Sequence, residues 1–224
     1  RQMCIRDRVG SLDSWRREDL RRTVRPMTET DGIRIVVYSF GPAVFGLAYL
    51  YHGARYGAEK SNPLVIAYLA GMVAGPLALG TFTAIEWVPV YNRIMANMSE
   101  QPESLLLAFS LFVIGPVEEV AKLFVLWLFM YRRSEFDRPV DGLTYACAVG
   151  LGFASVENWY AMSEFGEDWA RAILLPFLHP LFSALWGVGL AYAKFGKSRR
   201  YRALVYVCLP LSFIYHGLFD YIVL

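Results

Sequence analysis

The sequence predicts an all-α fold, a polytopic bundle of about six membrane-spanning helices. Of its 224 residues, 56% are hydrophobic and 16% are aromatic, whereas an ordinary soluble domain is about 45–50% apolar. The apolar residues form six continuous stretches, and each can cross ~30 Å of hydrocarbon at 1.5 Å per residue. The charged residues gather in short segments between these stretches, as in the loops of multi-pass proteins. Continuous apolar runs also exclude a β-barrel, whose strands alternate in polarity.

The first two predicted helices have no ionisable group far from their ends. They are Ile33–Tyr51 and Leu64–Val88. His52 and Glu86 lie near helix ends, where we expect them to anchor at the membrane interface. In the second helix, Gly71 and Gly75 form a GxxxG face, which permits close helix packing.

The other four predicted helices carry ionisable groups well inside their apolar stretches. These helices are Ser104–Tyr131, Val140–Met162, Trp169–Phe195 and Tyr201–Leu224. Their buried groups, in chain order, are Glu118, Glu119, Lys122, Glu157, His179, His216 and Asp220. A carboxylate at bilayer depth costs at least about 2.5–3.5 kcal/mol. Contributions from four helices therefore favour a shared functional site over separate structural ion pairs.

The lysines and arginines of the loops predict the orientation in the membrane. The loops after the first, third and fifth helices are basic, and the other loops are mainly acidic. The basic residues are Arg55, Lys60, Arg132, Arg133, Arg138, Lys194, Lys197, Arg199, Arg200 and Arg202. The positive-inside rule places these loops in the cytoplasm and both termini outside. Counted from the outer helix ends, the buried glutamates and histidines then lie ~8–21 Å deep.

Residues 1–26 are excluded from the predicted fold. Arg1–Arg8 resembles translated adapter sequence, and the stretch up to Arg25 is rich in arginine without apolar periodicity. We therefore expect Met27 to be the true start and residues 27–224 to form a single integral membrane domain. The alternative is a disordered basic arm, which would argue for the opposite orientation.

Residue spacing predicts how the buried groups interact. Glu118 and Lys122 are four residues apart, on one helix face and in the order that favours ion pairing, whereas Glu119 is rotated by ~100°. Lys122 is thus expected to neutralise one carboxylate and leave the other free.

Neighbouring residues are expected to affect the tautomer of one histidine and the backbone geometry of the other. Asp220 follows His216 by four residues and can accept a hydrogen bond from one ring nitrogen, fixing the tautomer. Pro180 follows His179 and biases it away from α geometry. We expect a locally opened helix that exposes this imidazole to a cavity.

Such a cluster can activate water in two ways. Glu118 or Glu119 can act as a general base, with Glu119 and Lys122 completing a charge network and the histidines stabilising the oxyanion or leaving amine. Alternatively, His179, His216 and Glu157 would form a His₂Glu ligand set for a divalent metal such as zinc. The single-helix HExxH zinc signature is absent from the sequence.

At these residues the chain resembles the PrsW family of intramembrane proteases, within the CAAX-protease-like superfamily. The matching motifs are EEVAK with Glu118, FASVE with Glu157, the isolated His179, and HGLFD with His216 and Asp220. The resemblance covers about residues 33–224, including the order and spacing of the motifs. In the wider superfamily a histidine is usual at the position of Glu157.

The resemblance implies a multi-pass protease of the bacterial plasma membrane, surrounded by lipid. Such site-1 proteases cut a single-pass anti-sigma factor on its extracytoplasmic side, which starts a cascade that frees a sigma factor. PrsW-like enzymes are classed as metallopeptidases, so a divalent metal such as Zn is also implied. Nucleic acid is not an expected partner, since the net charge is only +2.

Two other classes of function compete with a protease. A proton-coupled small-molecule transporter also needs buried Glu, His and Asp residues. Transporters often carry inverted repeats with sites in both halves, whereas here the charged groups lie in the last four helices only. The other competitor is a membrane scaffold or receptor without enzymatic activity.

Overall fold

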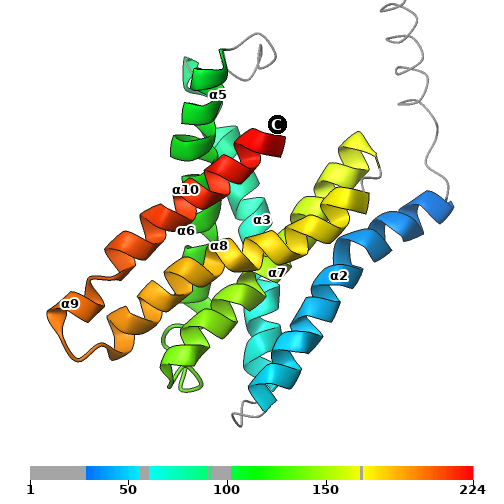
Figure 1. The fold of residues 1–224 in the computed structure, drawn as a ribbon. Coiled ribbons are helices and arrows are strands. Elements are labelled where there is room, and N and C mark those ends of the chain that lie inside the picture. The colour runs from blue at the N-terminus through cyan, green and yellow to red at the C-terminus, as the bar shows by residue number, and fades with distance from the viewer. Residues whose placement is uncertain (1–28, 56–60, 90, 92–101, 167–168, 224) are drawn as a thin grey trace, which may run out of the picture.

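The structure is a computed structural model that describes residues 29–55, 61–89, 91, 102–166 and 169–223. The predicted leader, residues 1–26, lies outside these ranges. Within them the chain forms helices and no strand. The elements are α2 (Glu29–Arg55), α3 (Ser61–Ile85), α5 (Glu103–Phe109), the π-helical η2 (Ser110–Ile114), α6 (Gly115–Phe129), α7 (Pro139–Phe165), α8 (Trp169–Phe195), α9 (Arg199–Arg202) and α10 (Val205–Val223), shown in Figure 1.

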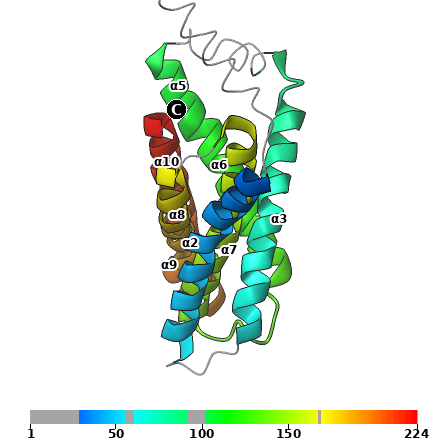
Figure 2. The same ribbon diagram turned by 90° about the vertical axis from the view of Figure 1, so that its right-hand side faces the viewer.

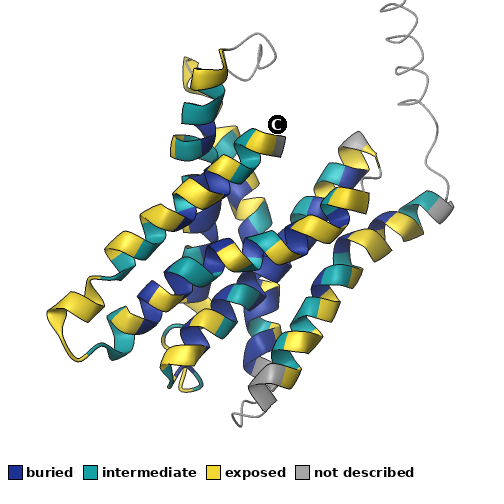
Figure 3. Cartoon of the chain, in the orientation of Figure 1, coloured by how far each residue is buried: buried dark blue, intermediate teal, exposed yellow. Residues whose placement is uncertain are grey.

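The prediction of six spanning helices is confirmed. Six segments of the described chain are long and apolar enough to cross a membrane, and each overlaps one predicted helix. They are Asp31–His52, Pro63–Ile85, Glu103–Phe129, Pro139–Glu164, Trp169–Phe195 and Arg199–Ile222. Their outward side chains are often large and apolar, for example Phe45, Leu69 and Leu174. Figure 3 shows exposed residues along the outer faces of the helices and buried ones where helices meet.

The structure corrects the sixth predicted helix, Tyr201–Leu224, which does not run unbroken. The short helix α9 ends at Arg202, a turn follows, and α10 begins at Val205. Ser198 caps α9, because its side chain accepts a hydrogen bond from the backbone N–H of Tyr201 at 3.4 Å. The break separates the arginines of α9 from the apolar helix α10.

Helix α7 lies at the centre of the bundle. It packs along α8, α3 and α2, while α6 packs against α3 and α10 (Figures 1 and 2). The end of α2, the α6–α7 connection and the α8–α9 connection all lie at the lower end in Figure 1. These are the predicted basic segments, so a single orientation can place all of them on one side of a membrane.

Glycines on α3 make its contact with α7 close, as the GxxxG face predicts. A Cβ on Gly71 would overlap the backbone of Val149, and one on Gly75 would lie 2.9 Å from Val156 Cγ1. Small residues at such crossings let two helix backbones approach each other. The close approach brings α3 alongside the part of α7 that carries Glu157.

The third spanning segment contains a π-helical turn, η2, between α5 and α6. Here the backbone N–H of Gly115 donates to the carbonyl of Ser110, five residues earlier. Only Gly115 separates the turn from Pro116, which has no N–H to donate. A π turn holds one residue more than an α turn, so the faces before and after it are offset by ~100°.

Glycines also bring α10 against η2 and α6. A Cβ on Gly217 would lie 2.5 Å from the Ser110 carbonyl oxygen and 2.7 Å from Leu111 Cα. A Cβ on Gly115 would lie 2.6 Å from the carbonyl oxygen of Phe213. These contacts place the residue before Gly217, which is His216, next to the first turn of α6.

Helix α8 stays regular through Pro180, so the expectation that this proline opens the helix at His179 is wrong. The backbone of these two residues is instead pressed against α7. A Cβ on Gly150 would lie 2.7 Å from Pro180 N and 2.8 Å from the His179 carbonyl oxygen. Membrane helices tolerate proline where neighbouring helices support the backbone. Tight packing, rather than an opened turn, therefore positions His179.

We expect Gly217→Ala to destabilise the bundle, because the added Cβ would force α10 away from Ser110. Overpacking costs typically about 1–3 kcal/mol, so the thermal unfolding midpoint of the protein in detergent should fall. Gly80→Ala is the matched control, since no described atom lies within 4 Å of its added Cβ. Equal midpoints for the two variants would contradict the close contact between α10 and η2.

Candidate functional site

Helix α6 places two glutamates and a lysine inside the bundle. Glu119 and Lys122 are completely buried, and Glu118 is 9% exposed. Lys122 Nζ lies 2.7 Å from Glu119 Oε1 but 3.8 Å from Glu118 Oε2. The ion pair that the spacing of four residues predicted between Glu118 and Lys122 is present, but the shorter contact is the one with Glu119. Helix neighbours three residues apart also face each other, so the flexible lysine reaches Glu119 and leaves Glu118 less constrained.

Glu119 is held on both carboxylate oxygens by other helices. Its Oε1, already paired with Lys122, lies 2.8 Å from His216 Nδ1. Its Oε2 accepts hydrogen bonds from Trp186 Nε1 at 2.7 Å and from Ser183 Oγ at 3.5 Å. Trp186 was not among the predicted site residues, because no sequence pattern within an apolar helix identifies an indole N–H as a hydrogen-bond donor.

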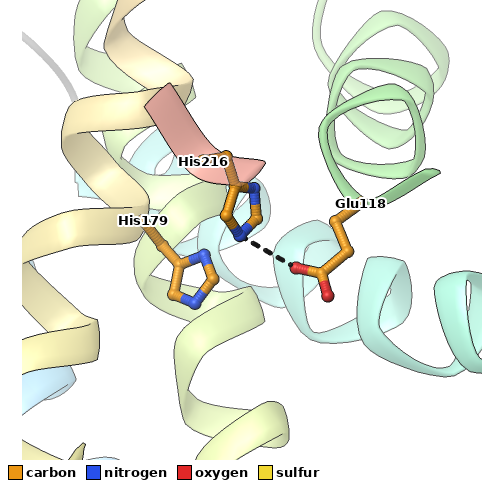
Figure 4. A group of neighbouring side chains, drawn as sticks. All are labelled: Glu118, His179 and His216. Carbon is orange, nitrogen blue, oxygen red and sulfur yellow. Dashed lines mark ion pairs between the residues drawn. The ribbon is translucent and has the colours of Figure 1, made fainter. Parts of the chain in front are cut away.

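Glu118 meets two imidazoles from two other helices (Figure 4). One ligand atom from each of Glu118, His179 and His216 lies within 4.8 Å of the other two. His216 Nε2 is 3.3 Å from Glu118 Oε2, and the two imidazole centroids are 5.0 Å apart, edge to face. Phe182 stacks on His216 with a centroid distance of 4.9 Å, which restrains the ring plane. The predicted convergence of buried acids and imidazoles is therefore present in the structure.

The acid nearest to His216 differs from the one expected. Asp220 Oδ2 lies 3.6 Å from His216 Nε2, which is longer than a hydrogen bond. Glu119 Oε1 is closer, at 2.8 Å from Nδ1 on the other edge of the ring. His216 thus lies between Glu119 on one side and Glu118 with Asp220 on the other.

Lys122 also contacts the second imidazole. Its Nζ lies 2.8 Å from His179 Nδ1 and 3.9 Å from the centroid of the Phe153 ring. A lysine ammonium can only donate, so Nδ1 is the accepting nitrogen. The other nitrogen, Nε2, lies 2.7 Å from Glu157 Oε2.

Glu157 of α7 has two partners on α8. It contacts His179 and forms an ion pair with Arg171. Arg171 was not among the predicted site residues, because its contact with Glu157 depends on how α7 and α8 cross. Every predicted site residue joins the same network.

A pocket of about 340 Å³ opens beside the cluster. Glu118, Glu157 and Arg171 form its polar wall. The remaining lining comes from α3 and α7 and is apolar apart from the indole N–H and the phenolic hydroxyl: Gly75, Pro76, Ala78, Leu79, Phe82, Phe153, Val156, Trp159, Tyr160 and Ala161. The pocket thus gives space for a substrate next to the carboxylate that is least constrained.

The side chains around Glu118 fit a divalent cation in kind and position. Two imidazoles and a carboxylate are a ligand set of catalytic zinc sites. Glu118 Oε2 and His216 Nε2 are buried and 3.3 Å apart, and neither has a well-aligned hydrogen-bond partner among the described residues. His179 Nε2 is buried too, but it lies 2.7 Å from Glu157 Oε2, a contact that a cation would have to displace. The predicted set contained Glu157, whereas the close group in the structure contains Glu118. Lys122 opposes a cation by its charge and occupies Nδ1 of His179.

Comparison with known proteins agrees with these features. Residues 59–224 match the sequence model of a family described as PrsW family intramembrane metalloprotease. A protein named Protease PrsW from Geobacillus kaustophilus is 35% identical over 186 residues, 82% of this chain and 76% of the relative. Those from Bacillus subtilis and Halalkalibacterium halodurans are 32% and 30% identical, over 84% and 85% of this chain and 82% and 83% of theirs. No solved structure matches the chain.

The matched region contains every residue of the site described above. A peptidase is therefore favoured over the proton-coupled transporter that the buried charges also suggested. Six apolar helices agree with a multi-pass protein of a bacterial membrane. The chain belongs to the PrsW family of intramembrane metalloproteases.

Proposed function

We propose that this membrane peptidase cuts a single-pass anti-sigma factor at site 1, on the extracytoplasmic side, and that Glu118, His179 and His216 form its catalytic centre. The observation that carries the catalytic part is the meeting of these three side chains within 4.8 Å. They come from three helices and lie beside a pocket whose wall contains Glu118. The substrate class rests on the resemblance of the motifs to those of PrsW proteases.

The depth of the centre supports an extracytoplasmic cut. Glu157 lies ~12 Å from the end of α7, and His216 lies ~10 Å from the end of α10. Both helix ends are opposite to the basic connections in Figure 1. With the basic connections in the cytoplasm, the centre lies in the outer half of the membrane.

The structure supports different roles for the two adjacent glutamates. Glu119 is enclosed by Lys122, Trp186 and His216, so we assign it the role of a fixed counter-charge. Glu118 faces the pocket, where its carboxylate can take a proton from water as the water attacks the scissile carbonyl carbon. His179 and His216 can then stabilise the oxyanion and pass a proton to the leaving amine.

A divalent cation such as Zn²⁺, which the family description implies, would be held by Glu118, His179 and His216. When bound, it would act as a Lewis acid on the water and the scissile carbonyl. Glu157 is then the second carboxylate in the pocket wall and the group left to accept the proton of water.

Glu118→Gln should reduce cleavage of a co-expressed single-pass anti-sigma factor by about 100-fold or more, because general acid–base catalysis typically contributes 10²–10⁴-fold. The measurement is the appearance of the shortened substrate on gels, with the cut site mapped by mass spectrometry. Glu164→Gln, an exposed glutamate at the end of α7, is the control and should cleave normally. Full cleavage by Glu118→Gln would rule out the proposed centre.

Removal of divalent metal by a strong chelator should abolish cleavage, and added zinc should restore it. Elemental analysis should find bound metal in the purified protein and much less in His216→Ala, which loses one of the three proposed ligands. In Glu157→Gln we expect the metal to remain and cleavage to fail. Full activity in a protein that contains no metal would contradict the proposed requirement for a divalent cation. Glu118 itself would then be the group that accepts the proton.

Trp186→Phe should lower the stability of the folded protein and slow the cleavage reaction, because Glu119 loses a buried hydrogen bond. Hydrogen bonds to charged groups are worth about 1.5–3 kcal/mol, so the thermal unfolding midpoint should drop. We expect the turnover rate to fall more than the affinity for substrate, since Glu119 holds the centre without touching the pocket. Trp127→Phe, at a 41% exposed position of α6, is the control. Identical behaviour of both variants would contradict the role of the indole N–H.

A further inference from the structure

The pocket beside Glu118 has two chemically different sides. Its volume is about 340 Å³, whereas an engineered cavity of about 150 Å³ is enough to bind benzene. There is thus room for a large side chain together with part of a peptide backbone. Carboxylates and a guanidinium form one side, and the apolar residues of α3 and α7 form the other.

We propose that the apolar side of this pocket binds a large apolar side chain of the substrate, aromatic or aliphatic, on a residue adjacent to the scissile bond. The inference rests on the proposed function, because it takes Glu118 as the group beside the bond that is cut. A peptide group inside a membrane needs polar partners, and Glu118, Glu157 and Arg171 supply the charged ones. The side chain next to that peptide group then faces the apolar wall.

Part of the pocket lining is exposed on the outside of the bundle, which suits a substrate that arrives from the bilayer. Leu79, Trp159 and Tyr160 line the pocket and are 45%, 48% and 43% exposed. A single-pass protein could therefore place the end of its membrane segment here without leaving the lipid. A lipid acyl chain is a poorer occupant, because it would leave the three charged side chains facing hydrocarbon.

Small residues on the two walls create the space. Gly75 and Ala78 on α3 and Ala161 on α7 have little or no side chain, and Leu79 reaches the pocket from an exposed position. Leu79 is therefore the best residue to change, because it lines the pocket without belonging to the packed core. Leu77, two residues away, is 39% exposed and does not line the pocket, so it provides a matched control on the same helix.

The test uses the full-length enzyme and a panel of single-pass reporters built on a cleaved anti-sigma factor. The reporters differ only in the residue before or after the mapped scissile bond, which is Ala, Leu, Phe, Trp or Asp. In one of the two positions, wild type should cleave beside Leu or Phe about tenfold faster than beside Ala, since pocket contacts of this size discriminate by tenfold or more. Leu79→Trp should remove that preference, and Leu77→Trp should keep it.

Leu79→Ala provides a second test, because it does not require the fold to accommodate a larger side chain. It should widen the pocket and raise cleavage beside Trp relative to Phe. An unchanged preference in both Leu79 variants would overturn the inference. So would an equal change for all reporters, which is the result expected if lipid fills the pocket.

Failure of the proposed function would look different. Cleavage of the reporters by Glu118→Gln, or no cleavage by wild type, would contradict the catalytic centre or the substrate class. A wild-type enzyme that cleaves only when Glu118 is intact, but with no preference for large apolar residues, would overturn the pocket assignment alone.

Discussion

The buried charge of Glu119 is the constraint on which the site depends. A carboxylate in a low-dielectric interior is stable only when it is paired and hydrogen-bonded. Lys122 provides the pairing from the same helix, while Trp186 of α8 and His216 of α10 provide the other contacts. Three helices are therefore held together at one anion. The same contacts leave Glu118, its neighbour in sequence, facing the pocket.

Close helix crossings make this arrangement possible. Gly217 against Ser110 brings His216 to α6, and Gly150 brings α7 to the backbone of His179. In a membrane, helices gain little from apolar burial alone, so small residues at crossings and polar contacts between helices decide the packing. Both the small residues and the polar contacts occur in the same region, and the pocket lies beside it, lined mainly by residues of α3 and α7.

The sequence predicted most of the fold and the charged residues that gather in the buried cluster, but not how they pair. Long apolar stretches specify spanning helices, and a charge such as Glu157 inside one is costly enough to indicate a site. Whether Lys122 turns to Glu118 or Glu119 depends on a side-chain rotamer. The contribution of Trp186 and Arg171 depends on how helices cross, which periodicity along one chain does not encode. The effect of Pro180 was misjudged because packing against α7 supports the helix there.

The π-helical turn before α6 affects how the protein tolerates changes in length. Its five residues, Ser110–Ile114, occupy the place that four would fill in an α-helix. Loss of one residue inside this turn can be absorbed by a return to α geometry, so both glutamates of α6 would keep their directions. The same loss between Glu119 and Lys122 would turn one away from the other. Homologues that differ by one residue in this span should therefore carry the gap before the glutamates and not after them.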